Sequence, residues 1–176
     1  MELGYPVGVR FHPLDHELVA YYLHKRAVMG DQFRPNVVSD CPDFYGEKEP
    51  WVIWDMYGGG GGESNKVEAL YFFAHRKKLN PTAKRFDRKV GSGTWSGESS
   101  KEVYNTSTTT HGKSVVIGIS RHFRYEGGCD SHHNGAWLMQ EYQMTENDTT
   151  VLCTLRKNSR KLPPPTTPTA NVIKER

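Results

Sequence analysis

The chain has 176 residues, of which 36% are hydrophobic and 24% charged, and its 23 basic and 20 acidic side chains give a formal net charge of +3. This length suits one domain with a buried core, and the composition excludes a chain that is disordered throughout. No apolar run reaches the roughly 20 residues of a membrane helix, so we expect no membrane association. The three cysteines are far apart, which argues against a disulfide framework and favours a reducing compartment.

Residues 11–30 are predicted to form an amphipathic helix. Pro13 suits the first turn of a helix, and Gly30 can end one. The predicted apolar stripe, near the 3.6-residue period, consists of Leu18, Val19, Tyr22, Leu23 and Ala27. Arg10 and Glu17 are seven residues apart, so they could form an ion pair within the chain or across a dimer.

Residues 36–70 are predicted to be irregular and anchored by tryptophans. The segment carries seven acidic and two basic residues, together with Trp51 and Trp54. Its glycine run, residues 58–62, lacks the Gly-Lys-Ser/Thr ending of a phosphate-binding loop. We therefore interpret this run as a linker.

Positive charge is concentrated between His75 and Lys89, where there are seven Lys or Arg residues and one Asp. Without this basic window the chain has 16 basic and 19 acidic residues, so the window reverses the sign of the net charge. Such a segment is either a solvated basic loop or a binding site for a polyanion. The Gly/Ser-rich run at residues 91–97 is predicted to be flexible around Trp95.

Strand patterns dominate the rest of the chain. Aromatic, β-branched or alternating segments, separated by turn residues, predict strands at residues 68–75, 114–125, 136–144 and 150–156. The short connections between them favour an antiparallel sheet. From Leu162 onward the Pro/Thr-rich sequence predicts a disordered tail.

Catalytic and metal-binding patterns are missing from the sequence. The chain contains no G-x-S-x-G, H-E-x-x-H or G-x-G-x-x-G motif. His12 and His16 have the i, i+4 spacing of a helical metal site, and Cys129 lies close to His132 and His133. Neither group supplies the roughly four ligands of a structural zinc site. We therefore predict no enzyme activity, no metal, no cofactor and no small-molecule substrate.

Five segments resemble, in the same order, the blocks of the plant NAC transcription factors. The first is GVRFHPLDHELV at residues 8–19, similar to the family's G-F-R-F-H-P-T-D-E-E-L-V. The others are FY and PW within residues 44–51, LYFF at 70–73 with RFDR and GSGTW within 85–95, WLMQEY at 137–142, and VLC at 151–153. Order and spacing hold from about residue 4 to 158, so the set is far more specific than any one block.

The resemblance implies an α+β, mostly β fold: a twisted antiparallel sheet flanked by an N-terminal helix and a short second helix. It implies a DNA-binding and dimerisation domain over residues 4–158, followed by a short Pro/Thr-rich disordered tail at residues 159–176. The implied function is sequence-specific binding of duplex DNA in the nucleus and regulation of transcription. In that mode a dimer places a strand edge in the major groove, which can admit strands as well as helices.

The resemblance also assigns site residues. In the family the first block forms the dimer contact, and the matching positions are Arg10, Pro13, Leu14 and Glu17. DNA contacts are expected at Arg76, Lys77, Lys78, Lys84, Arg85, Arg88, Lys89, Thr94, Trp95, Ser96 and Lys101. The implied partners are duplex DNA and a second NAC chain, identical or different.

The sequence departs from the family pattern at three informative positions. Ser96 replaces the lysine of W-K-A-T-G, and Glu98 adds an acid to the segment expected in the groove. Leu14 replaces the threonine at the helix entry, which predicts a weaker cap. These changes, with a C-terminal region expected to be shorter than the family's, support a second hypothesis. In it the chain dimerises with longer relatives, binds DNA weakly or not at all, and restrains them.

Overall fold

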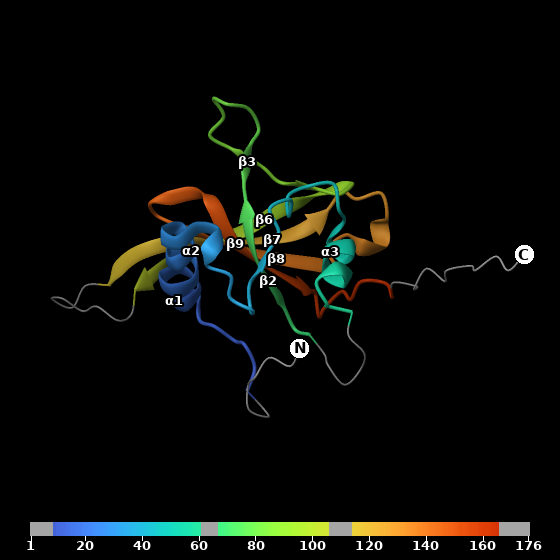
Figure 1. Ribbon diagram of the computed structural model, residues 1–176. Coiled ribbons are helices and arrows are strands. Elements are labelled where there is room, and N and C mark those ends of the chain that lie inside the picture. Colours follow the sequence, from blue (N-terminus) through green and yellow to red (C-terminus); the bar gives the residue numbers. More distant parts are fainter. Residues whose placement is uncertain (1–8, 61–66, 106–113, 166–176) are drawn as a thin grey trace, which may run out of the picture.

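The computed structural model describes residues 9–60, 67–105 and 114–165 (Figure 1). Its helical elements are α1 (Asp15–Glu17), η1 (Leu18–Leu23), α2 (His24–Met29), η2 (Gly30–Gln32), α3 (Pro50–Met56) and η3 (Ser131–His133). Its strands are β1 (Ser39–Asp40), β2 (Leu70–His75), β3 (Lys77–Lys78), β4 (Phe86–Asp87), β5 (Lys89–Val90), β6 (Gly93–Asn105), β7 (Val115–Glu126), β8 (Trp137–Met144) and β9 (Asn147–Lys157). Within the described residues, no helix is long and apolar enough to cross a membrane.

Seven strands form one curled sheet in the order β1-β2-β9-β8-β7-β6-β5, while β3 and β4 form a separate hairpin (Figure 1). Neighbouring strands of the sheet are antiparallel except for β1 and β2. Strand β5 pairs only with the first two residues of β6, so most of β6 forms an edge of the sheet. The predicted α+β, mostly β fold, with its antiparallel sheet, N-terminal helix and short second helix, is confirmed.

Strands β2, β8 and β9 are covered on both faces of the sheet, because successive side chains of a strand point to opposite faces and each of these strands contributes residues to two cores. Cys153 and Leu155 of β9 pack in one core with Trp54 of α3. Leu152, the residue before Cys153, points to the opposite face and packs in a second core with Leu18 of η1. Helix α3 therefore covers one face of the sheet, and the N-terminal helical segment covers the other.

The N-terminal helix starts later than predicted. It begins at Asp15 with Leu14 as its N-cap, so Pro13 precedes the helix instead of occupying its first turn. Element η1 is a π-helix, and its buried residues are Leu18, Val19 and Leu23. The wider π turn shifts the phase of the stripe, so that the Arg26 side chain is only 9% exposed while Ala27 faces solvent. The prediction for Ala27 was therefore wrong.

The acidic segment 36–70 is more ordered than predicted. It contains β1 and the helix α3, which starts with Pro50 at a position that needs no backbone N–H donor. Within the glycine run, Gly59 lies against the indole of Trp54, where an added Cβ would be 2.2 Å from the ring. Gly59 thus packs in the structure, whereas residues 61–62 of the predicted linker lie outside the described residues.

The four predicted strands are confirmed as β2, β7, β8 and β9. The prediction of a flexible run at residues 91–97 was wrong, because the long strand β6 starts at Gly93. Its glycines and serines lack the alternation that marks a half-buried strand, and its pairing with β7 holds it extended. Residues 166–176 of the predicted tail lie outside the described residues.

Candidate nucleic-acid interface

The hairpin of β3 and β4, residues 77–87, projects from the body of the molecule (Figure 1). Asn80 organises its turn, since the Asn80 side chain accepts a hydrogen bond from the Thr82 backbone N–H at 3.1 Å. The Leu79 N–H donates to the Arg85 carbonyl at 3.2 Å and closes the loop. The basic window of the sequence is therefore a defined hairpin rather than an unstructured loop.

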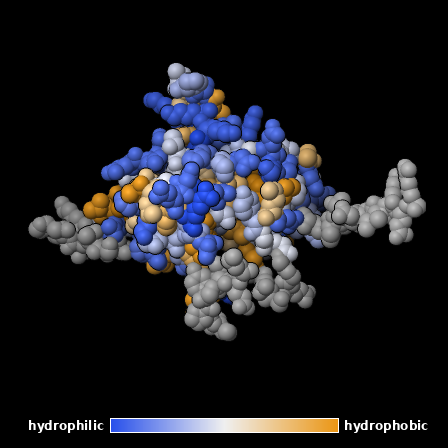
Figure 2. Space-filling view, in the orientation of Figure 1, coloured by the Kyte–Doolittle hydropathy of each residue, from blue (hydrophilic) through white to orange (hydrophobic). Residues whose placement is uncertain are grey.

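Five basic side chains on or beside the hairpin are exposed and make no hydrogen bond or ion pair with any described residue. These free cations are Lys77, Lys78, Lys84, Arg85 and Lys89. Hydrophilic residues predominate on the projecting hairpin in Figure 2. Because no carboxylate in the described part of the chain neutralises these side chains, their charge is available to an anionic partner.

A groove of about 520 Å³ lies between the hairpin and the strands β6 and β7. None of the residues that line it is acidic. Its basic lining residues are Arg76, Lys84, Arg85, Arg88 and Arg121. This basic groove continues the positive surface of the hairpin toward the sheet.

The floor of the basic groove is built on one buried carboxylate, Glu141 of β8, whose side chain has no exposed surface. Arg76 lies 3.2 Å from Glu141, and Arg88 binds both carboxylate oxygens. Arg121 approaches the same carboxylate at 3.6 Å. We call Arg76, Arg88, Arg121 and Glu141 the arginine cluster. It leaves an excess of positive charge beneath the groove.

The arginine cluster also ties the hairpin to the sheet. The Arg76 guanidinium donates to the Asp148 carbonyl at 2.7 Å and lies 3.7 Å from the ring centre of Phe86 in β4. The Arg88 guanidinium lies 4.7 Å from the ring centre of Phe123 in β7. Cation–π contacts are strongest where water is excluded, and the side chains of Arg76 and Arg88 are only 1% and 17% exposed. These contacts therefore help to hold the base of the hairpin against the sheet.

Tyr45 completes the surroundings of Glu141. The Tyr45 O–H donates to the Glu141 carboxylate and lies 3.5 Å from Cys153 Sγ. Burial raises the pKa of both Tyr45 and Cys153, so both stay neutral near pH 7. Burial lowers the pKa of Arg88, but Tyr45 and Glu141 outweigh it and leave that pKa raised. Arg76 and Arg88, two predicted DNA contacts, are thus engaged in holding the fold together.

Three predicted contacts at the start of β6 differ in accessibility. Trp95 is 2% exposed and stacks with Phe44, at 6.2 Å between ring centres. Thr94 and Ser96 on either side of it are exposed, and the Thr94 hydroxyl donates to the Arg88 carbonyl at 3.1 Å. Trp95 is therefore a core residue, while Thr94 and Ser96 remain on the surface.

Residues 96–102 of β6 are all exposed, and no strand among the described residues pairs with their outer side; we call them the β6 edge. The β6 edge carries Glu98, Lys101 and Glu102. Lys101, a predicted DNA contact, forms an ion pair with Asp15 at 2.9 Å. The edge expected in the DNA groove therefore has two acids, and its one cation already has a partner.

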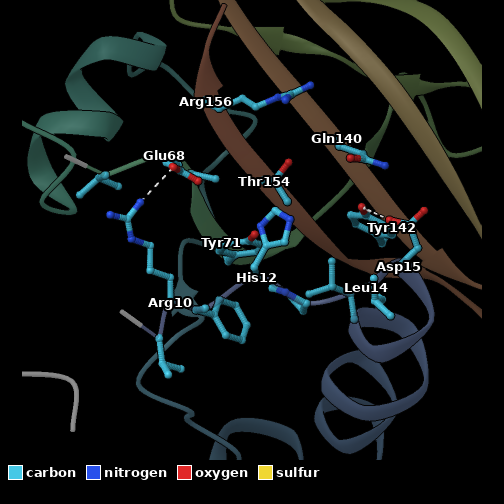
Figure 3. Close-up of a pocket in the computed structure, with 16 residues that line it drawn as sticks. Arg10, His12, Leu14, Asp15, Glu68, Tyr71, Gln140, Tyr142, Thr154 and Arg156 are labelled. Carbon is cyan, nitrogen blue, oxygen red and sulfur yellow. Dashed lines mark hydrogen bonds and ion pairs between the residues drawn. The ribbon is translucent and has the colours of Figure 1, made fainter. Parts of the chain in front are cut away.

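The predicted dimer residues lie on the N-terminal arm, residues 9–14, and in the first turn of the helix. Arg10 pairs with Glu68 at 3.2 Å (Figure 3). The Glu17 carboxylate accepts from the Leu14 N–H at 3.1 Å. Arg10 and Glu17 thus form no ion pair with each other in one chain. The hydrogen bond that Glu17 accepts supports the helix start, because the Leu14 side chain has no acceptor and cannot cap it.

A cavity of about 830 Å³ separates the N-terminal arm from the sheet (Figure 3). Its sheet residues are Tyr71, Gln140, Tyr142, Thr154 and Arg156. At one end Asp15 accepts a hydrogen bond from Tyr142 at 2.7 Å. Burial raises the pKa of Asp15, but the bonds from Tyr142 and Lys101 outweigh it and leave that pKa lowered. Asp15 therefore joins the helix start, the sheet and the β6 edge.

Comparison with known proteins decides the family. Residues 6–144 match the family model described as No apical meristem (NAM) protein. The chain belongs to the NAC family. NAC domain-containing protein 101 of Arabidopsis thaliana is 34% identical over 145 residues, which cover 81% of this chain and 38% of that protein. NAC domain-containing protein JA2 of Solanum lycopersicum is 30% identical over 175 residues, which cover 94% of this chain and 46% of that protein.

The match confirms the resemblance that the sequence blocks carried. NAC proteins are generally transcription factors and not enzymes. The chain spans less than half the length of the curated relatives described above. The NAC identity of this chain is therefore shown, whereas its own DNA target and partners are matters for proposal.

Sequence reasoning missed three charged residues of the interface. Glu141 was noted only as part of the W-L-M-Q-E-Y block, although an acid inside an apolar strand is a signal of a buried ion pair. Arg121 interrupted the apolar face of its predicted strand, which is the same kind of signal. Arg124, which lies 3.1 Å from Glu98 of the β6 edge, gave no such signal, because it shares its face of the strand with the polar Ser120 and His122.

Proposed function

We propose that this NAC chain is a sequence-specific DNA-binding transcription factor that acts as a dimer in the nucleus. One observation carries the proposal: the free cations and the basic groove lie beside a strand edge that no other described strand covers. Membership of the NAC family, whose proteins are generally transcription factors, supports the same function.

The free cations and the β6 edge divide the work of binding. The cations contact phosphates, which supply most of the affinity and set the register of the protein on the duplex. The β6 edge approaches the bases, because the major groove is about 12 Å wide and admits β structure. Ser96, Gly97 and Ser99 have small side chains, so the backbone of the edge can approach closely. Arg76, Arg88 and Trp95 support this surface from beneath.

Dimerisation through the N-terminal arm is part of the proposal. Val9 and Leu14 are 52% and 58% exposed, an apolar surface that a second copy can cover. The pair of Arg10 with Glu68 is well exposed and is worth at most about 1 kcal/mol. Arg10 can therefore exchange Glu68 for Glu17 of a second copy at little cost.

A second candidate function is a dimerising partner that binds DNA poorly and restrains longer NAC proteins. The observation that favours it is the β6 edge, where Glu98 and Glu102 repel phosphates and Lys101 is paired with Asp15. Under this alternative the free cations are a solvated surface. The chain would then form mixed dimers with a longer relative and lower that relative's affinity for DNA.

Fluorescence anisotropy with two duplexes tests the proposed function. One duplex carries the CGT-type core implied by the resemblance, the other a scrambled core, each at low and near-physiological salt. We expect tighter binding to the CGT-type core at both salts. Equal and strongly salt-sensitive binding to both duplexes would mean that only phosphates are contacted. No binding to either duplex would favour the second candidate function.

The double variant Lys84→Ala/Arg85→Ala identifies the phosphate contacts. It should weaken binding to both duplexes and lower the slope of log K against log salt by about 2, roughly one per lost contact. The matched control is Arg34→Ala/Lys48→Ala, which removes two exposed cations that lie outside the hairpin and the groove. If both double variants lose the same affinity, only net charge matters, and the hairpin is not the binding surface.

A further inference from the structure

The β6 edge contains one residue that its neighbouring strand does not pair. Gly97 is opposite Phe123 and Ser99 is opposite His122, so Glu98 is the extra residue of a β-bulge. Bulges turn a side chain away from its regular direction and are frequent at sheet edges beside functional sites. The direction of the Glu98 side chain therefore differs from the regular one of Glu102, the other acidic residue of β6.

The Glu98 carboxylate is held but not buried. It lies 3.1 Å from Nη1 of Arg124 on β7, and the two side chains are 42% and 45% exposed. The Nε of Arg124 is fixed in turn by Glu126, at 2.7 Å. Such an exposed pair contributes little to folding stability. Stability therefore does not explain why an acidic residue stands on the surface that is proposed to bind DNA.

The chemistry of base edges supplies an explanation. An ionised carboxylate only accepts hydrogen bonds. In the major groove cytosine offers the N4 amino donor, whereas guanine offers the acceptors N7 and O6, and adenine places its N7 acceptor beside its amino group. A fixed carboxylate on the β6 edge is therefore attracted to cytosine and repelled most by guanine.

We propose that Glu98 is a base-selecting residue of the β6 edge that accepts a hydrogen bond from the N4 amino group of a cytosine. Arg124 is a positioning residue that holds the carboxylate on the bulge. This inference rests on the proposed function, since it requires that the β6 edge enters the major groove. It gives the acid at position 98 a role in choosing the sequence rather than in lowering the affinity for all DNA.

Selection from a pool of duplexes with randomised sequence tests the inference through the variant Glu98→Gln. A glutamine can both donate to N7 and accept from N6 of adenine. At one position of the selected site we expect cytosine with the wild type and adenine with Glu98→Gln. The change in relative affinity for the two bases should be about fivefold to a hundredfold, the usual range for one good base contact. The other positions of the site should stay unchanged.

The control is Glu102→Gln, the same charge change on the same strand. Glu102 accepts a hydrogen bond from the Tyr104 hydroxyl at 2.6 Å and belongs to no bulge, so Glu102→Gln should keep the wild-type base preference. If Glu98→Gln and Glu102→Gln both bind every site more tightly with no change of preferred base, Glu98 acts only by repulsion and the inference is wrong. If the wild type binds no duplex, the proposed function fails, and the inference fails with it.

Arg124 provides an independent check. Arg124→Gln should weaken the preference for cytosine while leaving the melting temperature close to that of the wild type, and Arg124→Lys should restore part of the preference. A role in the fold alone would not change which base is selected. An unchanged preference in Arg124→Gln would contradict the positioning role.

Discussion

Two groups of basic side chains, most of them from the same short basic window, lie in opposite environments. The free cations of the hairpin are exposed and have no partner among the described residues. The arginines of the arginine cluster surround the buried Glu141, and the side chains of Arg76 and Arg88 are 1% and 17% exposed. A run of basic residues in a sequence therefore shows that cations are present. Whether they can bind an anionic partner depends on whether the fold places a carboxylate beside them.

The comparison assigns the two groups different roles. The arginine cluster fixes the base of the hairpin against the sheet, through Glu141, the Asp148 carbonyl and the ring of Phe86. The side chains of the free cations make no contact that stabilises the described fold, so they can replace bound water with a phosphate group. Variants of the two groups should consequently separate stability from DNA binding.

Glu141→Gln should have the largest effect on stability. The substitution keeps the size of the side chain but leaves the three guanidiniums without their counter-ion, and breaking a buried ion pair typically costs about 3–5 kcal/mol. Unfolding in urea at fixed protein concentration measures the loss. A fixed concentration is necessary because dimerisation would otherwise contribute to the measured stability.

Lys84→Ala is the counterpart from the free cations. Lys84 is exposed and unpaired within the described residues, so its removal should change the free energy of unfolding by no more than about 0.5 kcal/mol. If Glu141→Gln and Lys84→Ala unfold at the same urea concentration, the arginine cluster does not stabilise the fold, and the division between the two groups fails.

Arg121→Ala should give an intermediate result that sharpens the division. The Arg121 side chain is 29% exposed, donates to the Gln143 side chain at 2.7 Å and is 3.6 Å from Glu141. Loss of these partly solvated interactions should cost about 1 kcal/mol. Because Arg121 also lines the basic groove, the salt dependence of DNA binding should fall by at most about one phosphate contact. A loss of stability equal to that of Glu141→Gln would mean that Arg121 stabilises the fold as much as the buried ion pairs do.

The strands of the sheet were predictable where the local pattern of apolar side chains alone determines the secondary structure. Strands β2, β7, β8 and β9 are apolar or alternating and lie between turn residues, and each was found close to its predicted position. Strand β6 was missed as a pattern because its own side chains do not alternate, and its long pairing with β7, the next strand, holds glycines and serines extended. The phase shift at η1, which buries Arg26 in place of Ala27, also depends on tertiary packing.

The candidate site was predictable as a region but not residue by residue. The basic window coincides with the hairpin and supplies four of the five basic residues that line the groove, because charge composition is local in sequence. The burial of Arg76 and Trp95 was not predictable, since their partners Glu141 and Phe44 are distant in the chain. The role proposed for Glu98 depends on a bulge, which the register with β7 creates and no local pattern marks.

His133 extends the comparison to a buried basic residue whose neighbouring carboxylate, that of Asp130, is partly exposed. It stacks on Trp51 with 3.7 Å between ring centres, and the Trp137 indole N–H donates to its Nδ1 at 3.0 Å. The nearest acid, Asp130, is 3.9 Å from Nε2. Burial lowers the pKa of His133, and Asp130 opposes this shift only in part. Unlike the buried arginines, His133 is therefore neutral at pH 7, with Nδ1 accepting a hydrogen bond.

The effect of pH follows from that lowered pKa and should be the smallest of these effects. A group whose pKa is lower in the folded state contributes its full stability above the unfolded value near 6.5 and loses it as pH falls through the folded value. Melting temperature should therefore fall between pH 7 and 5, and His133→Gln should flatten this fall because glutamine does not titrate. Some slope should remain, since burial and Lys101 also lower the pKa of His122. His132→Gln, at an adjacent side chain that is 81% exposed, is the control and should keep the wild-type slope. An equal slope in His133→Gln would mean that folding does not lower the pKa of His133, and that burial beside Trp51 and Trp137 does not disfavour its charged form.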